Sequence, residues 1–325
     1  MTKPPTEALE AIWRPIDGAG VIVLAMHVNP DGDALGSGIA FARALRKIGK
    51  KAHLVCSQKA PDIYAFLQPQ EVMEEFYEGP QPDLAILLDC DRPERTADQE
   101  TLITSARETM VIDHHPPSGD YGDHRLTVVE AAATAELIQV LVKHRGIPID
   151  LKMAQALLTG LITDTGCFRF PNTTPRALLC AAELVDIGAS TADISERVYD
   201  TRSFSALRLL ARTLNSIQTS PRGTIVWAKL GYQDFQDTGA KPEETEGFVN
   251  IIHSLEGADV AAFLREETPG TVRISLRGRQ DSEVNHIAES LGGGGHKLAA
   301  AAVIESTLPD AESRLVELFR QWTEF

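Results

Sequence analysis

The chain has 325 residues, with 31 lysines and arginines against 46 aspartates and glutamates, which gives a net charge of −15. Proteins hold long nucleic acids by neutralising their phosphates, so this acidic balance argues against a long DNA or RNA partner. The N-terminal residues have no apolar signal core, and no apolar run in the chain is long enough to span a bilayer. We therefore expect a cytoplasmic protein with no membrane partner.

The first part of the chain alternates short apolar runs with helical patterns. The expected strands are residues 21–26, 52–55, 84–88 and 109–112. The expected helices are residues 7–13, 35–48, 131–144, 151–163 and 174–186. Strands that alternate with helices predict an α/β domain with a parallel sheet, and such sheets bind ligands at the carboxyl ends of their strands.

The pattern changes in the remainder of the chain. Residues 191–217 are expected to be helical, and a boundary is expected near Gly223. The later elements predict a smaller mixed α/β domain with an antiparallel hairpin near residues 266–270. Its expected strands and helices are strands 224–230, 260–265 and 271–276, and helices 244–254, 283–291 and 308–322. The predicted organisation is a domain over 1–190, a helical connector over 191–219 and a domain over 220–325.

The loop from His27 to Ser37 follows the first strand and carries His27, Asp31 and Asp33. These residues place two negatively charged carboxylates beside an imidazole, and the two carboxylates repel each other unless a cation lies between them. This donor set, without a thiolate, suits a hard or borderline divalent ion such as Mn²⁺ or Mg²⁺. The alternative is a simple turn in which an aspartate caps the following helix.

Other acids and histidines follow the later elements of the same domain. Asp89 comes directly after the strand at 84–88, and an Asp-His-His run at 113–115 follows the strand at 109–112. Asp164 follows the helix at 151–163. The carboxyl ends of parallel strands meet at one edge of a sheet, so the residues that follow the strands are expected to gather there.

The second domain contains an alternating basic segment and a glycine run. In a strand, Arg273, Ser275, Arg277 and Arg279 would share one face, and the forked donors of arginine suit phosphate. The run Gly292–Gly295, followed by His296, would let backbone amides surround an anion in a loop. The alternatives are a solvated polar face for the strand and a flexible linker for the glycines.

Taken together, these motifs resemble the DHH phosphoesterase family, named for the Asp-His-His seen here at 113–115. The glycine–His motif resembles the DHH-associated C-terminal domain, and the resemblance covers nearly the whole chain. Length and domain content are similar to the nano-RNase branch, which acts as oligoribonuclease and as phosphatase of 3′-phosphoadenosine-5′-phosphate (PAP). Two positions depart from the family pattern: Ser118 stands where an asparagine is usual, and Ala301 where a glycine is usual.

The resemblance implies a centre of two Mn²⁺ ions, with Mg²⁺ or Co²⁺ as alternatives. One ion would be held by His27, Asp31 and Asp89, and the other by Asp33, Asp89, His114 and Asp164. Asp89 would bridge the two ions, because neighbouring cations need a shared anionic ligand. Asp113 is interpreted as a residue that orients a neighbouring histidine. The implied catalytic residues are Asp89 and His115, and the implied substrate contacts are His115, Arg277, Gly293, Gly294, Gly295 and His296.

The function implied by the resemblance is hydrolysis of short oligoribonucleotides to mononucleotides, and also of PAP. Residues 1–190 would then form the metal-binding catalytic domain and residues 220–325 the substrate-binding domain. One alternative is a phosphodiesterase for cyclic or linear dinucleotides, of the c-di-AMP or pApA type. Another, from a different class, is a non-catalytic nucleotide-sensing module. The substrate partner is a short RNA or a nucleotide phosphate, and the sequence leaves the oligomeric state open.

Overall fold

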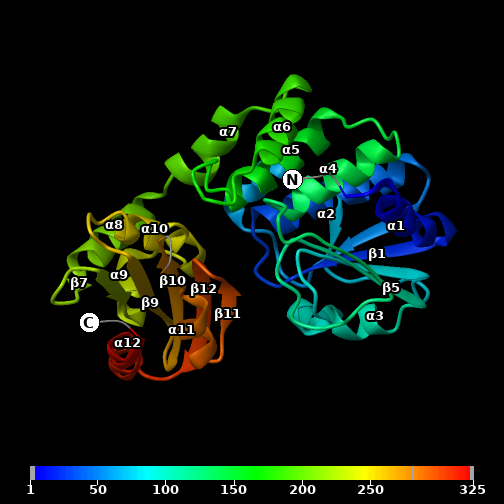
Figure 1. The fold of residues 1–325 in the computed structure, drawn as a ribbon. Helices are drawn as coiled ribbons and strands as arrows, with labels where there is room; N and C mark the ends of the chain where they lie inside the picture. The colour runs from blue at the N-terminus through cyan, green and yellow to red at the C-terminus, as the bar shows by residue number, and fades with distance from the viewer. Residues whose placement is uncertain (1–3, 280–281, 323–325) are drawn as a thin grey trace. The chain divides into compact units, whose positions relative to one another are not determined.

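The computed structural model describes residues 4–279 and 282–322. The chain divides into two compact units, Met1–Asp200 and Thr201–Phe325, which are the first and second units below (Figure 1). Within the described residues, each unit contains one six-stranded sheet. The predicted fold class, a parallel α/β domain followed by a smaller mixed α/β domain, is confirmed.

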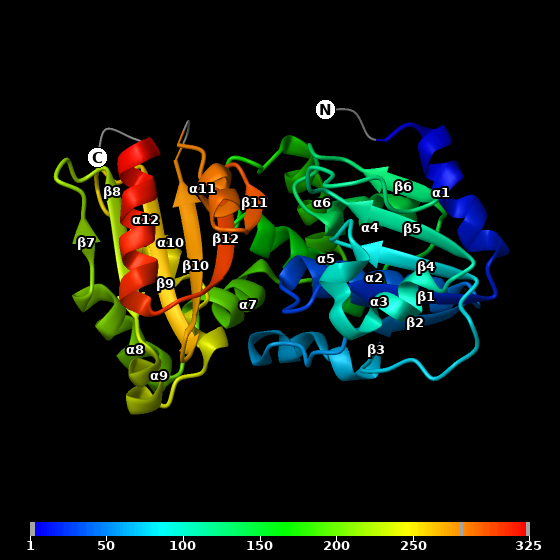
Figure 2. The ribbon, with the colours of Figure 1, turned by 90° about the horizontal axis from the view of Figure 1, so that it is seen from below.

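The sheet of the first unit has the strand order β3-β2-β1-β4-β5-β6, and every neighbouring pair is parallel (Figure 2). Its strands are β1 (Val21–Met26), β2 (Lys51–Val55), β3 (Met73–Glu74), β4 (Leu84–Leu88), β5 (Glu108–Asp113) and β6 (His124–Thr127). The four predicted strands are β1, β2, β4 and β5. The short edge strands β3 and β6 have too few apolar residues to have been predicted.

Helices cover both faces of this sheet, which explains why β1 and β4 are apolar on both sides. Side chains of β1 such as Leu24 pack in a core with α1, α2, α4 and α5, whereas Val23 and Ala25 face a second core that contains Ile103 of α3. The helices of the unit are α1 (Thr6–Gly18), α2 (Gly32–Lys47), α3 (Glu100–Thr104), α4 (Thr134–His144), α5 (Leu151–Asp164), α6 (Pro175–Asp186) and α7 (Thr191–Ser195).

Helices α2 and α5 pack at very short range through glycines. A Cβ atom on Gly36 would collide with the carbonyl oxygen of Ala156, and one on Gly32 would collide with the side chain of Thr163. Only glycine permits this approach of the two backbones. The contact matters for the site, because it brings the N-terminus of α2 next to Asp164, the last residue of α5.

Replacing Gly36 with alanine should therefore lower the free energy of unfolding by about 1–3 kcal/mol, the usual cost of overpacking a close contact. Urea unfolding followed by circular dichroism measures the change. Gly18 provides the control, since it is also helical and a Cβ there meets nothing within 4 Å. Gly18→Ala should leave stability unchanged or raise it slightly, and equal losses in both variants would contradict the close-packing explanation.

The second unit is built on a mixed sheet with the order β11-β12-β10-β9-β8-β7, in which only β8 and β9 run parallel. Its strands are β7 (Gln218–Thr219), β8 (Ile225–Leu230), β9 (Val260–Thr268), β10 (Thr271–Gly278), β11 (Gly294–His296) and β12 (Ala299–Glu305). Its helices are α8 (Phe204–Asn215), α9 (Tyr232–Thr238), α10 (Phe248–His253), α11 (Asn285–Ser290) and α12 (Leu308–Trp322).

The predicted hairpin is confirmed, because β9 and β10 pair antiparallel on either side of Gly270. Two predicted helices are each divided into two parts in the structure. The helix expected over 244–254 is a 3-10 turn, η5 (Pro242–Thr245), followed by α10, because Gly247 between them adopts a φ of 80°. The helix expected over 191–217 is interrupted at residues 201–203. Its two parts belong to different units, with α7 in the first and α8 in the second.

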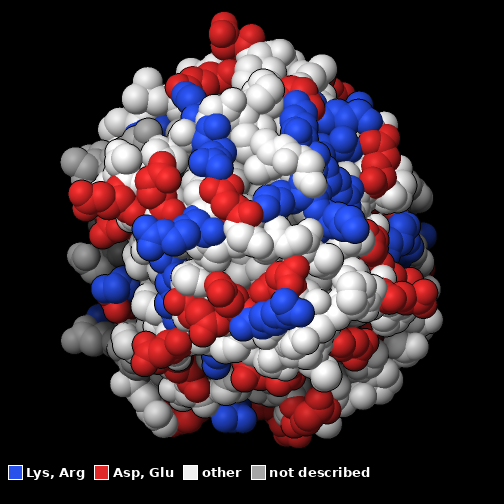
Figure 3. All heavy atoms as spheres, turned by 90° about the vertical axis from the view of Figure 1, so that its right-hand side faces the viewer, with Lys and Arg blue, Asp and Glu red and all other residues white. Residues whose placement is uncertain are grey.

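Acidic and basic side chains are interspersed over the face of the molecule shown in Figure 3. Several surface cations form ion pairs with acids, including Lys47 with Asp150, Arg145 with Asp17 and Lys152 with Glu71. Cations neutralised in this way are poor phosphate ligands, which agrees with the net charge of −15. Among the described residues, no helix is long and apolar enough to cross a membrane.

Candidate metal centre

The predicted metal ligands of the first unit meet at the carboxyl edge of its sheet. His27 follows β1, Asp89 follows β4, and His114 and His115 follow β5. The other predicted metal ligands lie at the ends of two helices. Asp31 and Asp33 lie at the N-terminus of α2, and Asp164 is the last residue of α5.

Asp89 lies at the centre of this cluster. One of its oxygens, Oδ2, is 3.5 Å from Nε2 of His27, and the other, Oδ1, is 3.6 Å from Nε2 of His114 and 3.6 Å from Nδ1 of His115. The backbone of Asp89 adopts a φ of 60°, a left-handed conformation that is uncommon for residues other than glycine. Such strain is typical of functional sites, and here it turns a buried carboxylate toward three histidines.

Among the described residues of the first unit, three groups of side chains could each hold a metal ion. Within each group, the potential ligand atoms lie within 4.8 Å of one another, and Asp89 belongs to all three groups. The first group is His27, Asp31 and Asp89, and the second is Asp33, Asp89 and His114. These groups correspond to the two ligand sets implied by the sequence resemblance. Asp164 adjoins the second, since its Oδ2 is 3.0 Å from Nε2 of His114. The third group is Asp89, Asp113 and His115.

Asp31 caps α2 and also lies close to two other predicted metal ligands. Its Oδ1 accepts hydrogen bonds from the backbone N–H groups of Asp33 and Ala34, each at 3.0 Å, so it is the N-cap of α2. The same side chain lies within ligand distance of His27 and Asp89. The capping bonds fix the carboxylate of Asp31 in place, and a cap of this kind is compatible with metal coordination by its remaining lone pairs.

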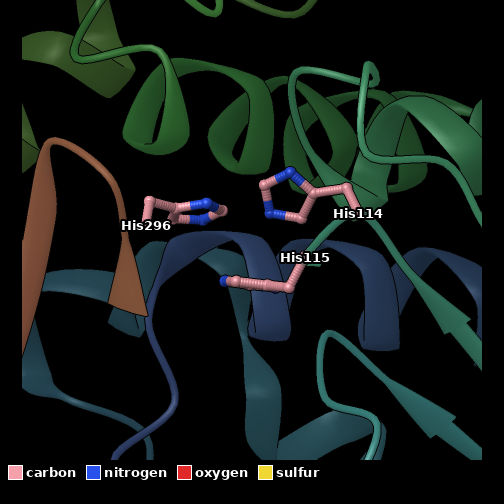
Figure 4. Close-up of side chains that lie close together, drawn as sticks. All are labelled: His114, His115 and His296. Atoms are coloured by element: carbon pink, nitrogen blue, oxygen red, sulfur yellow. The ribbon is translucent and has the colours of Figure 1, made fainter. Parts of the chain in front are cut away.

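The two histidines after β5, whose side chains are labelled in Figure 4, contact different partners. Nδ1 of His114 is 3.3 Å from the carbonyl oxygen of Ala131, which points Nε2 toward the acids. Asp113 accepts hydrogen bonds from both the backbone N–H of His115, at 3.0 Å, and its Nδ1, at 2.7 Å. Asp113 is thus placed to orient His115, the geometry expected of a carboxylate behind a functional imidazole.

The charges of the cluster shift several pKa values. Burial, together with the charges of Asp89 and Asp164, raises the pKa of Asp33 well above its usual range. Burial also acts to raise the pKa of Asp89, but the hydrogen bond with His27 and the charges of three histidines outweigh it and lower that pKa. Burial opposes protonation of His27, yet its bond to Asp89 and the charge of Asp31 raise its pKa to about 9. The carboxylates therefore favour positive charge at this edge.

A divalent ion suits these residues better than protons alone. The donors are carboxylate oxygens and imidazole nitrogens, with no thiolate among the three groups of the first unit. Hard and borderline ions such as Mg²⁺ and Mn²⁺ prefer such ligands. Asp33 and Asp89 are almost completely buried, and buried carboxylates that lack an opposite charge are costly.

Comparison with known proteins identifies the family. Residues 21–161 match the N-terminal domain of the DHH family, and residues 223–324 match the DHHA1 domain. The chain is 35% identical over 304 residues to the bifunctional oligoribonuclease and PAP phosphatase NrnA of Thermus thermophilus, covering 93% of this chain and 90% of the relative. The chain belongs to the DHH family. It is therefore related to metal-dependent hydrolases that act on phosphoester bonds.

Two further proteins are similar to this chain. The structure of an exopolyphosphatase-related protein from Bacteroides fragilis matches with a TM-score of 0.91 and 25% identity, over 99% of this chain and 98% of that one. The cyclic-di-AMP phosphodiesterase GdpP of Geobacillus thermodenitrificans is 26% identical over 93% of this chain, but the match spans only 48% of that relative. The fold of the Bacteroides fragilis protein therefore extends over nearly the whole of this chain.

Ser118, which stands where the resemblance leads us to expect an asparagine, connects two loops near the candidate site. Ser118 donates hydrogen bonds from its backbone N–H and its hydroxyl to the carboxylate of Asp91, at 2.5 and 2.6 Å. Asp91 also lies 3.8 Å from Arg125. In this chain, Ser118 therefore ties the loop after β5 to the loop after β4.

Sequence reasoning missed Thr134, the first residue of α4. Its hydroxyl donates a hydrogen bond to Asp89, and its backbone N–H donates one to Asp33. The only signal in the sequence was a threonine at the start of a helical pattern, which normally indicates a cap. The helix was predicted to begin at residue 131, but residues 131–133 precede it and place Thr134 at its N-terminus.

The glycine run of the second unit differs from the predicted anion-binding loop. The N–H groups of Gly292 and Gly293 donate to carbonyls of α11, those of Glu289 and Ala288, so these two amides end a helix. The expectation of an irregular loop is also wrong for Gly294–His296, which form β11 against β12. A Cβ on Gly293 or Gly295 would collide with β12. These glycines therefore permit close pairing with the alanines of that strand.

Two other predicted substrate contacts, Arg277 and His296, lie on β10 and β11 of the second unit, with β12 between these strands. The predicted alternation of β10 is confirmed: Val272, Ile274 and Leu276 are buried, and Arg273 and Arg277 share the opposite, half-buried face. Nε of Arg277 donates to Oδ1 of Asn250 on α10 at 3.0 Å, and Nη1 donates to the carbonyl of Leu276. His296, labelled in Figure 4, is the last residue of β11.

Proposed function

We propose that this protein is a Mn²⁺-dependent phosphoesterase that hydrolyses short oligoribonucleotides to mononucleotides, and that it also removes a phosphate from PAP. The observation that carries the proposal is the position of Asp89, a buried carboxylate shared by all three ligand groups of the first unit. A shared carboxylate is what a pair of closely spaced cations requires. The 35% identity to an oligoribonuclease and PAP phosphatase supports the choice of substrate.

The residues that would hold the ions are assigned from the groups described above. His27, Asp31 and Asp89 would hold one ion, and Asp33, Asp89, His114 and Asp164 the other. When bound, two such ions neutralise phosphate charge and lower the pKa of a coordinated water, which makes an attacking hydroxide available at neutral pH. No protein nucleophile is required, and none of the ligand groups found among the described residues of the first unit contains a cysteine.

His115 has a separate proposed role in binding the reacting phosphate. Asp113 accepts the hydrogen bond from Nδ1 of His115, at 2.7 Å, which fixes the ring and raises its basicity. Burial opposes protonation of His115, but the hydrogen bond to Asp113 and the charge of Asp89 raise its pKa. A cationic His115 would bind a phosphate oxygen and stabilise the negative charge that develops during hydrolysis.

The same cluster would also serve a phosphodiesterase for cyclic or linear dinucleotides, and the similarity to GdpP favours this as the second candidate. A nucleotide-sensing module without catalysis is disfavoured, because binding alone would not require every acid and histidine of the cluster to be present. Substrate preference therefore separates the two enzymatic candidates, and turnover separates both from a sensor.

A parallel substrate panel tests the proposal. Protein stripped with EDTA should be inactive, and added Mn²⁺ should restore hydrolysis better than Mg²⁺ or Co²⁺. With Mn²⁺, kcat/KM should be highest for a dinucleotide RNA and measurable for PAP, as followed by product release on an anion-exchange column. Faster turnover of cyclic di-AMP than of linear RNA would favour the second candidate. Full activity in excess EDTA would rule out a metal-dependent mechanism.

A further inference from the structure

Thr134 contacts two buried carboxylates of the proposed metal centre, those of Asp33 and Asp89. Its backbone N–H donates to Oδ2 of Asp33 at 2.6 Å, and its hydroxyl donates to Oδ1 of Asp89 at 2.9 Å. Asp33 comes from the first turn of α2 and Asp89 from the end of β4, so no local sequence relation sets the distance between them. Thr134 is fully buried and donates hydrogen bonds to both carboxylates.

The N-terminus of α4 holds Asp33 by both oxygens. The next backbone N–H of the helix, that of Ala135, donates to Oδ1 of Asp33 at 2.8 Å. The residue before the helix, Ala133, has no side chain able to cap it, so a carboxylate from α2 performs that task. The partial positive charge of a helix N-terminus favours this arrangement.

Helix α5 closes the remaining side of Asp33. A Cβ atom on Gly160 would lie 2.6 Å from Oδ1 of Asp33 and 2.7 Å from the Cβ of Ala135. A side chain at position 160 would therefore push the carboxylate and the start of α4 apart. The absence of a side chain at Gly160 therefore lets the carboxylate of Asp33 pack between α4 and α5.

We propose that Thr134 is a positioning residue for the metal pair: its N–H and its hydroxyl together set the separation and orientation of Asp33 and Asp89. A carboxylate can only accept in these bonds, so each donated bond fixes one oxygen and directs the remaining lone pairs toward the ions. The inference rests on the proposed function, since it assumes that Asp33 and Asp89 are metal ligands. It concerns metal affinity and geometry, and does not require contact between Thr134 and the substrate.

Two substitutions separate the hydroxyl from the rest of the side chain. Thr134→Val keeps the shape and the backbone N–H but removes the hydroxyl, whereas Thr134→Ser keeps the hydroxyl. Calorimetric titration with Mn²⁺ should show a loss of roughly 10- to 100-fold in affinity for Thr134→Val, as is typical when a residue supporting a metal ligand is lost. Thr134→Ser should stay within about threefold of the wild type. Thr134→Ala provides a second hydroxyl-free variant, to be compared with Thr134→Ser if the valine variant does not fold.

The electron paramagnetic resonance spectrum of the Mn²⁺-loaded protein is a readout that a merely structural role would not change. The wild type should show the exchange-coupled signal of a Mn²⁺ pair, Thr134→Ser should retain it, and both hydroxyl-free variants should show mainly isolated ions. Wild-type affinity and an intact coupled signal in Thr134→Val would overturn the inference. So would equal losses in Thr134→Ser and Thr134→Ala, because the hydroxyl would then be irrelevant.

The outcome can be separated from a failure of the proposed function. A wild-type protein that binds a Mn²⁺ pair but hydrolyses none of the panel substrates would contradict the proposed function while leaving the role of Thr134 to be decided by the titrations. A wild-type protein that is active, with Thr134→Val equal to it in affinity and spectrum, would contradict only the role of Thr134. A wild type that binds no Mn²⁺ would overturn both.

Discussion

Replacing Asp89 with alanine is expected to reduce kcat/KM on a dinucleotide RNA by about 10³-fold or more. The substitution removes the carboxylate that belongs to every ligand group of the first unit, so neither proposed ion keeps its full set of ligands. A metal ion contributes several kcal/mol of transition-state stabilisation, and a loss of about 4 kcal/mol corresponds to about 10³ in rate. Initial rates at saturating Mn²⁺, together with the number of ions bound after dialysis, measure the effect.

Asp120 supplies a matched control for Asp89. It is an exposed aspartate in the loop after β5, close in sequence to the histidines of the site. Asp120→Ala should keep wild-type activity and bind as much Mn²⁺ as the wild type. If Asp89→Ala retained more than a tenth of the activity while folded, or bound two ions as tightly as the wild type, the shared-ligand assignment would have to be abandoned.

Removing the guanidinium of Arg277 should lower kcat/KM on a dinucleotide by roughly 10- to 100-fold, since hydrogen bonds to charged groups contribute about 1.5–3 kcal/mol. Asn250 holds Nε of Arg277 at 3.0 Å, so the guanidinium is fixed before any phosphate binds. The predicted metal ligands all lie in the first unit, and Arg277→Ala should leave Mn²⁺ binding unchanged. Rates on RNA of two, five and fifteen nucleotides, and on a small generic phosphodiester, measure which substrates depend on Arg277.

Arg273 is the control for this experiment, because it is a half-buried arginine on the same face of β10. Arg273→Ala should have little effect, while Arg277→Ala should lose most of its activity on the dinucleotide and little on the small phosphodiester. The wild type should prefer the shortest RNA. If the wild type favoured fifteen nucleotides, or if Arg277→Ala lost activity equally on every substrate, Arg277 would not be a residue that binds dinucleotides selectively. Either result would point toward a processive exonuclease.

Sequence patterns were informative wherever the structural cause is local. Apolar runs predicted β1, β2, β4 and β5, because strands covered by helices on both faces must be apolar throughout. Alternation predicted the two faces of β10, because successive side chains of a strand point in opposite directions. The metal-site residues could be proposed for the same reason, since the ends of parallel strands meet at one edge of the sheet whatever lies between them.

Edge pairing in the second unit could not be predicted from local pattern. Four consecutive glycines predict a loop, because their backbone amides can turn toward an anion without a side-chain clash. In the structure, Gly294 and Gly295 pair with Ala301 and Ala300, and the absence of a side chain at Gly295 lets the two backbones approach. The partner strand, β12, decides the conformation of these glycines, and its effect does not appear in the periodicity of the run itself.

By itself, the sequence determined the parallel α/β class and placed His27, Asp89 and His114 after three of the predicted strands, because burial and strand direction follow from local composition. Only the tertiary structure decided how Asp33 and Asp89 are held. Their partner Thr134 belongs to α4, and the space around Asp33 depends on Gly160 of α5. Hydrogen bonds and close packing between distant segments arise when helices dock, and no periodicity in any one segment records them.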